Sequence, residues 1–324
     1  MKRNLLIVAI ALLTVAFVSC KKDGVYKPKE KIAKIYKEWT TIDVTTQVTP
    51  DMTTTRTDTT AQPRYVAEEW NWVDKTLGSV VFKNSNGSVD VNVAYIYDDK
   101  NRVTGLTFDG GKVEYAYNDD KKLQSLKYYE DNELSFSFDI EYEDKLPVKV
   151  AMTEYWGASD FKNMSDFAKS LIPRYILKYM ELKEKELKAK ATHTYTITAN
   201  ITWDGKNISQ VVTTEPDDDP VTTTYEYDNN INPYYGMYGA VCVFEEEADG
   251  LHFAYSKNNV VKETSSFTNN NKTITTIDEY TYEYDGKYPT SVTTVYRYEN
   301  TSSNGDYSFS YKTTTRSTTT YEYK

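Results

Sequence analysis

The strongest constraint on the fold is a short unit of two alternating aromatic or large apolar residues followed by a polar residue. It recurs as Tyr95-Ile96-Tyr97-Asp98, Tyr115-Ala116-Tyr117-Asn118, Ile140-Glu141-Tyr142-Glu143, Ile201-Thr202-Trp203-Asp204, Tyr225-Glu226-Tyr227-Asp228, Phe253-Ala254-Tyr255-Ser256, Tyr282-Glu283-Tyr284-Asp285 and Tyr321-Glu322-Tyr323-Lys324. Alternation with period two places both large side chains of a unit on one face of a strand. The Asp, Asn or Ser that follows can open a turn. Counted at the second large residue, the units from Tyr97 to Tyr142 and from Trp203 to Tyr284 lie 20 to 29 residues apart, which is the length of one hairpin.

Further turn signals lie between these units. They are Asn86-Gly87, Asp109-Gly110-Gly111 and Asn304-Gly305, and Asn101, Asn207 and Asn259 each follow a turn-opening residue by three positions. Asn tolerates the left-handed backbone that short hairpin loops require. The chain is therefore predicted to be mainly β, a large antiparallel β-barrel or strongly curled sheet of about 14 or more strands.

The aromatic content is dominated by tyrosine, with 30 Tyr against 11 Phe and 5 Trp. Tyrosine suits positions with one dry and one wet end, as on a curved single-layer sheet. A first strand is expected over residues 31–39. Residues 40–62 are rich in Thr and poor in apolar partners, so we expect a long loop or an edge hairpin there.

The one helical pattern covers residues 160–190, where apolar residues recur every three or four positions. Pro173 is expected to divide it into segments of about 160–171 and 174–190. The structural interpretation is that this insertion covers an open end or face of the sheet. The functional interpretation makes it a plug, a lid or a docking helix.

The N-terminus has the layout of a bacterial lipoprotein signal. Lys2 and Arg3 precede an apolar run from Leu5 to Val18, and Cys20 follows a small residue. That run is shorter than the roughly 20 residues needed to span a bilayer. We expect residues 1–19 to be a signal peptide, Cys20 to be lipidated, residues 20–30 to form a tether, and residues 31–324 to form a single β-domain. The alternative is an ordinary secretory signal with an incidental cysteine.

Charge and cysteine content exclude several classes of function. The chain carries 48 Asp and Glu against 38 Lys and Arg, a net charge of −10. Nucleic-acid binding depends largely on Lys and Arg contacts to phosphate, so no nucleic-acid partner is expected. Once Cys20 is acylated only Cys242 remains, which excludes an intrachain disulfide and a multi-cysteine zinc site. Membrane contact is expected through the lipid anchor alone.

The units resemble tyrosine–aspartate repeats of bacterial wall-associated and toxin-shell proteins. More closely, the chain resembles a family of uncharacterised lipoproteins from gut Bacteroidetes with a porin-like β-fold. The stretches that carry this resemblance are Asn232-Pro233-Tyr234-Tyr235-Gly236, Ser256-Lys257-Asn258-Asn259-Val260, Tyr284-Asp285-Gly286-Lys287-Tyr288-Pro289-Thr290-Ser291, Ile32-Ala33-Lys34-Ile35-Tyr36 and Cys20-Lys21-Lys22-Asp23. The family has no assigned activity.

The resemblance implies export to the outer membrane, on either its periplasmic or its surface side. Lys22-Asp23 matches part of a surface-export signal of such bacteria, and Asp58-Thr59-Thr60 matches their short O-glycosylation pattern with Thr59 as acceptor. A membrane-spanning barrel is disfavoured because the aromatics recur at most hairpins rather than in two girdles. Charged or Thr residues also occupy the other strand face.

No catalytic motif is present. His193 and His252 have no second ligand at metal-binding spacing, and there is no nucleophile elbow or phosphate-binding Gly loop. Asp217-Asp218-Asp219 could hold a cation but lacks the spacing of a calcium loop, so a solvated turn is favoured. Neither a cofactor nor a metal is expected.

Three hypotheses for function remain. The favoured one is a non-catalytic binding module for a glycan or a protein, with Trp70, Trp72, Trp156 and Trp203 as ligand-stacking residues. The alternative is a structural or assembly component of the envelope that docks through a sheet edge or the 160–190 helix. A glycan-acting hydrolase would need two carboxylates, and the sequence singles out no such pair.

Overall fold

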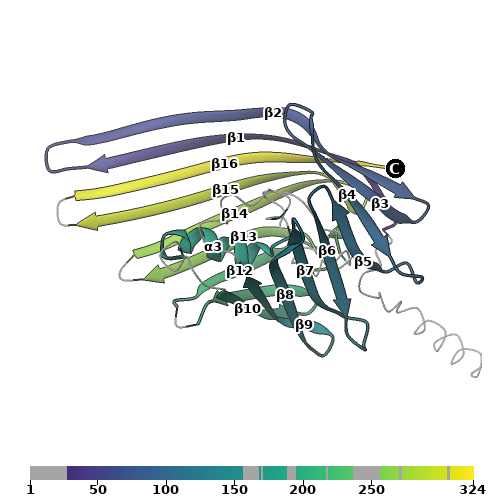
Figure 1. Ribbon diagram of the computed structural model, residues 1–324. Helices are drawn as coiled ribbons and strands as arrows, with labels where there is room; N and C mark the ends of the chain where they lie inside the picture. Colours follow the sequence, from purple (N-terminus) through teal and green to yellow (C-terminus); the bar gives the residue numbers. More distant parts are fainter. Residues whose placement is uncertain are drawn as a thin grey trace, which may run out of the picture.

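The computed structural model describes residues 28–155, 168, 171–187, 195–216, 218–235, 256–269, 272–304 and 307–324. Over these residues the chain forms a closed antiparallel barrel (Figure 1). Each strand pairs with the next along the chain, and β1 pairs with β16, as Ile35 does with Tyr321. The predicted barrel is therefore confirmed, and the closure rules out an open curled sheet.

Most neighbouring strands are joined by short connections; the two long ones run from β9 to β10, which includes the helix, and from β12 to β13. The strands are β1 (Ile32–Val48), β2 (Thr53–Val73), β3 (Thr76–Lys83), β4 (Val89–Tyr97), β5 (Val103–Phe108), β6 (Gly111–Tyr117), β7 (Leu123–Glu130), β8 (Glu133–Glu143), β9 (Leu146–Glu154), β10 (Tyr195–Asp204), β11 (Asn207–Thr214), β12 (Val221–Tyr227), β13 (Val260–Asn269), β14 (Lys272–Asp285), β15 (Tyr288–Asn304) and β16 (Tyr307–Tyr323). The helix α3 (Arg174–Leu187) lies between β9 and β10.

The barrel is apolar inside and polar outside. In β4, Val93 and Tyr95 are buried while Asp90 and Asn92 are exposed, and in β6 Val113 is buried beside exposed Glu114. Successive residues of a strand point to opposite faces, so this alternation directs the apolar side chains into the barrel. The hydrophobic core is therefore the barrel interior. Among the described residues, no helix is long and apolar enough to cross a bilayer.

In six of the alternating units the second large residue has a structural task that Trp72 and Tyr282 share. At one end of the barrel, every even-numbered strand donates a side-chain hydrogen bond of 2.6 to 2.9 Å to a carbonyl at the start of the preceding strand. The bonds run from Trp72 to Ile32, Tyr97 to Leu77, Tyr117 to Val103, Tyr142 to Leu123, Trp203 to Pro147, Tyr227 to Ile208, Tyr282 to Val260 and Tyr323 to Pro289. We call these eight donors the aromatic ring. It links each turn of this end to the next.

Two of the turn residues, Asp98 and Asn118, make the backbone hydrogen bonds that their side chains predict. The Asp98 carboxylate accepts hydrogen bonds from the backbone N–H groups of Lys100 and Arg102, both at 2.9 Å, and Asn118 accepts one from Lys122. A register shift accompanies each of these strand ends, for example between Ile96 and Tyr97. The unit in β14 differs, because Tyr282 takes the carbonyl while Tyr284 bonds to Asp228.

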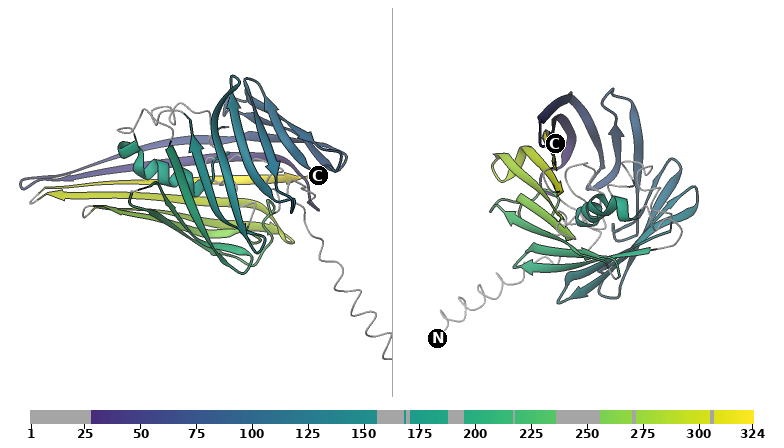
Figure 2. Two further views of the ribbon diagram at one scale, coloured as in Figure 1. Left: turned by 60° about the horizontal axis from the view of Figure 1, so that its bottom comes forward. Right: turned by 90° about the vertical axis from the view of Figure 1, so that its left-hand side faces the viewer.

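Helix α3 lies inside the barrel, against the inner faces of β10 to β13 (Figure 2). It begins directly after Pro173, whose carbonyl accepts the first helical hydrogen bonds, from Ile176 and Leu177. Its buried face includes Tyr175 and Ile176. The helix therefore lies in the lumen and covers part of the inner face of the sheet, while the first segment expected at 160–171 lies mostly outside the described residues.

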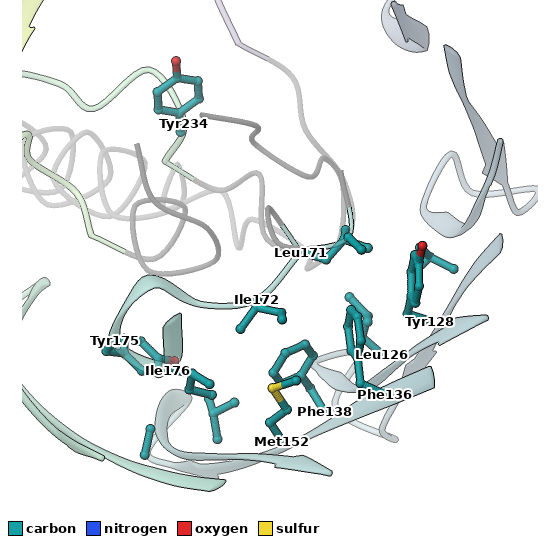
Figure 3. Close-up of a cluster of buried hydrophobic side chains, with 14 of the residues drawn as sticks. Leu126, Tyr128, Phe136, Phe138, Met152, Leu171, Ile172, Tyr175, Ile176 and Tyr234 are labelled. Carbon is teal, nitrogen blue, oxygen red and sulfur yellow. The ribbon is translucent and has the colours of Figure 1, made fainter. Parts of the chain in front are cut away.

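The core between the helix and the wall is densely aromatic (Figure 3). Tyr128 stacks on Phe136 with centroids 4.7 Å apart, and Phe136 meets Phe138 edge to face at 5.6 Å. Ile172 and Met152 are fully buried in the same core. Large, interdigitated apolar side chains of this kind supply most of the stabilisation of a fold.

Part of the wall extends well beyond the barrel. β1, β2, β15 and β16 continue as a sheet past the ends of their neighbours (Figures 1 and 2), and we call this extension the projecting sheet. β1 pairs with β2 from Trp39↔Gln62 to Val48↔Thr53. Residues 40–62 are thus a long hairpin at the edge of this sheet rather than a loop, and the first strand runs nine residues beyond the predicted end at Trp39.

Candidate functional site

The inner face of the projecting sheet continues the inner wall of the barrel into solvent. Strand alternation and the pairing registers place its side chains together. We call these residues the inner platform: Trp39, Thr41 and Asp43 of β1, Arg56, Asp58 and Thr60 of β2, Tyr296 and Tyr298 of β15, and Tyr311, Thr313 and Thr315 of β16. This surface combines aromatic rings with hydroxyl, carboxylate and guanidinium groups.

Asp43 is the centre of the hydrogen-bond network on the platform. Its Oδ1 accepts bonds from the Tyr311 hydroxyl at 2.9 Å and from the Thr313 hydroxyl at 2.8 Å. Thr41 and Thr315 bond through their hydroxyl oxygens at 3.0 Å. These half-buried groups hold one another in place, so polar atoms in fixed positions face the solvent. Fixed donors and acceptors of this kind give a binding surface its orientation and specificity.

Aromatic rings flank this network. Tyr298 and Tyr311 meet edge to face with centroids 6.0 Å apart. Tyr296 lies nearer the barrel, where the Lys178 ammonium of α3 lies 4.3 Å from its ring centroid. Tyrosines offer large, rigid contact area with a polar end, which suits adhesion to sugars and peptides alike.

The outer strand of the platform carries an exposed ion pair. Arg56 Nε lies 2.8 Å from Asp58 Oδ2, and the side chains are 76% and 55% exposed. An ion pair this exposed contributes little to stability. Both groups therefore remain available to a ligand or a partner.

A buried charge network closes the base of the platform. Arg174 of α3 lies 3.1 Å from Asp278 and 3.6 Å from Glu263, and Lys178 lies 3.6 Å from Asp278. All four side chains are at least nine-tenths buried. Two cations of the helix thus face two carboxylates of the wall, and the network fixes α3 against β13 and β14.

The far side of the helix is fixed to the β11–β12 connection. The Tyr179 hydroxyl donates to Asp218 at 3.0 Å and accepts from the Glu215 backbone N–H at 3.3 Å. Burial, reinforced by the nearby Glu215 and Asp218 carboxylates, raises the pKa of Tyr179 well above its usual value. A neutral hydroxyl therefore holds the helix in place. Asp218 takes part in this contact, while Asp217 lies outside the described residues.

Of the four tryptophans predicted to stack on a ligand, the three that the structure describes do not lie on the platform. Trp70 is 2% exposed and donates from Nε1 to Glu68 at 2.7 Å, so it has no face to offer a ligand. Trp72 and Trp203 are partly buried members of the aromatic ring, and ligand stacking by them stays a prediction. Trp156 lies outside the described residues.

The remaining predicted sites divide between exposed and undescribed residues. Thr59 is exposed on β2, on the outer face of the projecting sheet, so a sugar acceptor there would be accessible. Cys20, Cys242, His193 and His252 lie outside the described residues. No cluster of three His, Cys, Asp or Glu side chains suited to a metal occurs among those that are described.

A hollow lies at the opposite end of the barrel, among the turns of the aromatic ring. It has a volume of about 360 Å³ and is lined by Lys100, Arg102, Lys121, Tyr117 and their neighbours. The Arg102 guanidinium covers the Tyr117 ring at 4.2 Å and pairs with Asp98 at 3.1 Å. Because these contacts already engage Arg102, the hollow is a weaker candidate than the platform.

Sequence reasoning missed the platform residues because they lie in the Thr-rich stretches. Tyr296-Arg297-Tyr298 has the alternation of the other units but is not followed by a turn residue. Asp43 and Tyr311 lie 268 residues apart in the chain. The pairing of the first strand with the last brings these residues together. Because only closure of the barrel creates this pairing, no local sequence pattern indicates it.

No protein-family model matches the chain, and no curated protein matches it. Among solved structures, a porin-like protein from Bacteroides uniformis ATCC 8492 is 12% identical with a TM-score of 0.31, over 94% of this chain and all of that protein. TcdB2-TccC3-TEV is 10% identical with a TM-score of 0.27, over 78% of this chain. TcdB2-TccC3 without its hypervariable C-terminal region gives the same values. The chain spans 16% of the length of either of these two proteins.

Proposed function

We propose that this chain is an exported, lipid-anchored binding protein that holds a glycan on its inner platform without transforming it. The observation that carries the proposal is the Asp43 network, in which fixed hydroxyl and carboxylate groups lie beside the Tyr298–Tyr311 pair. Sugars present hydroxyls at their edges and apolar C–H faces. A surface that alternates polar atoms with aromatic rings matches both features.

Binding without catalysis is supported by the openness of the platform. Catalytic carboxylates act from enclosed sites that exclude water and shift their protonation. Asp43 and Asp58 instead lie on an open sheet, and each already has its own donors, from Tyr311 and Thr313 or from Arg56. This arrangement suits the holding of a ligand better than proton transfer.

A lipid anchor at Cys20 explains how such a protein stays at the outer membrane. Outward positions of the wall such as Asp90, Glu114 and Glu226 are exposed and acidic, whereas barrels embedded in lipid carry an apolar outward band. We therefore place the barrel in water beside the membrane. Protease shaving of intact cells, with a periplasmic protein as control, tests on which side of the outer membrane the protein lies.

The proposed function is tested by affinity electrophoresis of the protein in native gels containing soluble polysaccharides, neutral and acidic. We expect at least one polysaccharide to retard the protein. Tyr298→Ala and Tyr311→Phe should then reduce the retardation, the first by removing a ring and the second by removing the hydroxyl bonded to Asp43.

The matched control is Tyr155→Ala, because Tyr155 is an exposed tyrosine at the end of β9, away from the platform. It should migrate like the unsubstituted protein. The proposal fails if no polysaccharide retards the protein. It also fails if the platform variants are retarded as strongly as the control.

A second candidate function, assembly of the envelope, is favoured by one specific observation. The outer edge of β2 in the projecting sheet has no pairing strand among the described residues. Exposed edges are the usual places where strands of another chain are added.

A further inference from the structure

The outer edge of the projecting sheet is a regular strand that pairs on one side only. Thr53 to Gln62 of β2 pair with β1 without a register shift. β3 reaches β2 only from Glu68 onward, and no other described strand lies beside residues 53–62 (Figure 1). Thr53 to Ala61 are all exposed. A row of backbone N–H and C=O groups therefore faces solvent along this edge.

This edge lacks the features that normally prevent pairing. Proteins protect exposed edges with proline, bulges or single-sign charge. Here Pro63 comes only after the regular segment, and Arg56 and Asp58 carry opposite charges. Thr, which fills most of the remaining positions, has a high strand propensity.

The sequence of the edge is self-complementary about Thr57. If two copies pair antiparallel with Thr57 opposite itself, Arg56 of each copy faces Asp58 of the other. Thr55 then faces Thr59, and Thr54 faces Thr60. Opposite-charge and Thr–Thr cross-strand pairs both stabilise antiparallel sheets. The arrangement creates two ion pairs and no like-charge contact.

We propose that two copies of this chain associate through this edge, with β2 paired to β2 and Thr57 on the twofold axis. Such an interface is isologous, as in most homodimers. The two barrels then lie at opposite ends of one continuous sheet. Residues opposite each other point to the same face, so the two inner platforms combine into one larger surface.

The pairing also explains why the Arg56–Asp58 ion pair is exposed in the single chain. An intrachain pair with 76% and 55% exposed side chains is weakly held. Replacing this intrachain ion pair with the Arg56–Asp58 pairs between the two copies therefore costs little free energy. Thr59 lies on the outer face of the sheet, so a sugar on it would project away from the platforms.

The first test is sedimentation velocity of the full chain over a range of concentrations, for the unsubstituted protein and for Arg56→Asp, Asp58→Arg and the double swap. We expect a monomer–dimer equilibrium. Each single substitution turns two opposite-charge contacts into like-charge contacts and should weaken the dimer roughly tenfold. The double swap should restore it, and circular dichroism confirms that each variant is folded.

The second test uses the position on the twofold axis. Thr57→Cys should give a covalent dimer with a short thiol cross-linker, because the two introduced thiols face each other across the axis. Thr55→Cys is the control, since its two copies would lie about 14 Å apart along the strands. The unsubstituted protein accounts for the native cysteines.

Several results overturn the proposal. It is wrong if the protein stays monomeric at every concentration reached, or if a dimer forms that the single charge reversals do not weaken. It is equally wrong if the Thr55→Cys variant cross-links as readily as the Thr57→Cys variant. Binding of polysaccharide is measured separately, so failure of the dimer leaves the proposed function to its own test.

Discussion

Asp43 of β1 and Asp58 of β2 lie directly opposite each other on the inner platform. Like charges in this position destabilise an antiparallel pair unless other groups compensate them. The compensation differs between the two residues. Asp43 accepts bonds from two half-buried hydroxyls of β16, while Asp58 is paired with the exposed Arg56. Asp43 therefore has a structural role in the platform, whereas the side chain of Asp58 is only weakly constrained.

The first prediction follows from this difference. Asp43→Ala should lower the free energy of unfolding by about 1 kcal/mol or more, because the hydroxyls of Tyr311 and Thr313 lose their acceptor. Asp58→Ala should change it by no more than about 0.5 kcal/mol. Urea denaturation followed by tryptophan fluorescence measures both. Equal effects for the two variants would show that the Asp43 network does not fix the platform.

The second prediction concerns the aromatic ring. Tyr97→Phe removes a 2.6 Å hydrogen bond to the Leu77 carbonyl while keeping the ring in place. We expect a loss of about 1 kcal/mol, since a part-buried acceptor is left without its donor. The control is Tyr155→Phe, which alters an exposed tyrosine and should leave the urea midpoint unchanged. A silent Tyr97→Phe would mean that water replaces the lost donor.

The third prediction is an alkaline transition. Burial raises the pKa of Tyr97 to about 12 and raises the pKa values of Tyr227 and Tyr323 as well. A group whose pKa is raised by folding stabilises the fold fully below its unfolded pKa, about 10 for tyrosine, and loses that contribution as the pH rises through the folded value. Stability should therefore fall between about pH 10 and 12.

Ultraviolet absorbance of the phenolate measures this transition. In the folded protein, exposed tyrosines should ionise near their usual pKa and a second group should ionise late, together with loss of the circular dichroism signal. In denaturant, all tyrosines should ionise in one step. A single step in the folded protein would contradict the burial of these ring hydroxyls.

Much of the barrel could be predicted because its signals are local. The alternating units directly encode strand ends and turns, and Asn101 adopts the predicted left-handed backbone with φ of 57°. Asn207 does not, because Gly205 takes the left-handed position in the shorter turn between Asp204 and Asn207. Asn259 does not adopt it either. The number of residues in a turn decides which of them adopts the left-handed backbone. The spacing between the alternating aromatic units does not specify that number.

An edge hairpin over residues 40–62 is one of the two predictions for that stretch, but the extent of the projecting sheet and the platform could not be predicted because their determinants are nonlocal. Both faces of a Thr-rich strand are polar. Residues 40–62 therefore lack the alternation of apolar and polar residues by which a strand is distinguished from a loop. The amphipathic pattern of α3 indicates that the helix packs on a sheet, but it cannot show that the helix enters the lumen. The partners of Arg174 lie on β13 and β14, far along the chain, and only the closed barrel brings them together.

The last prediction concerns this buried network. Asp278→Asn removes the carboxylate that lies 3.1 Å from Arg174 and 3.6 Å from Lys178, so the buried network loses one negative charge while both cations remain. Breaking a buried pair in this way costs about 3–5 kcal/mol. We expect a large fall in the melting temperature measured by circular dichroism. If Asp278→Asn unfolds the protein outright, the variant and the unsubstituted protein are compared by the amount of soluble protein that each gives on expression.

Adding Lys178→Met to Asp278→Asn removes one charge of each sign and should recover part of the lost stability, because the remaining Arg174 and Glu263 still pair. The matched control is Glu226→Gln, which breaks an exposed pair with Lys262 at 3.1 Å and should change stability by no more than about 0.5 kcal/mol. If the double variant is less stable than Asp278→Asn alone, the packing of the Lys178 side chain on Tyr296 outweighs its charge. The helix would then be held in the lumen mainly by that packing rather than by charge balance.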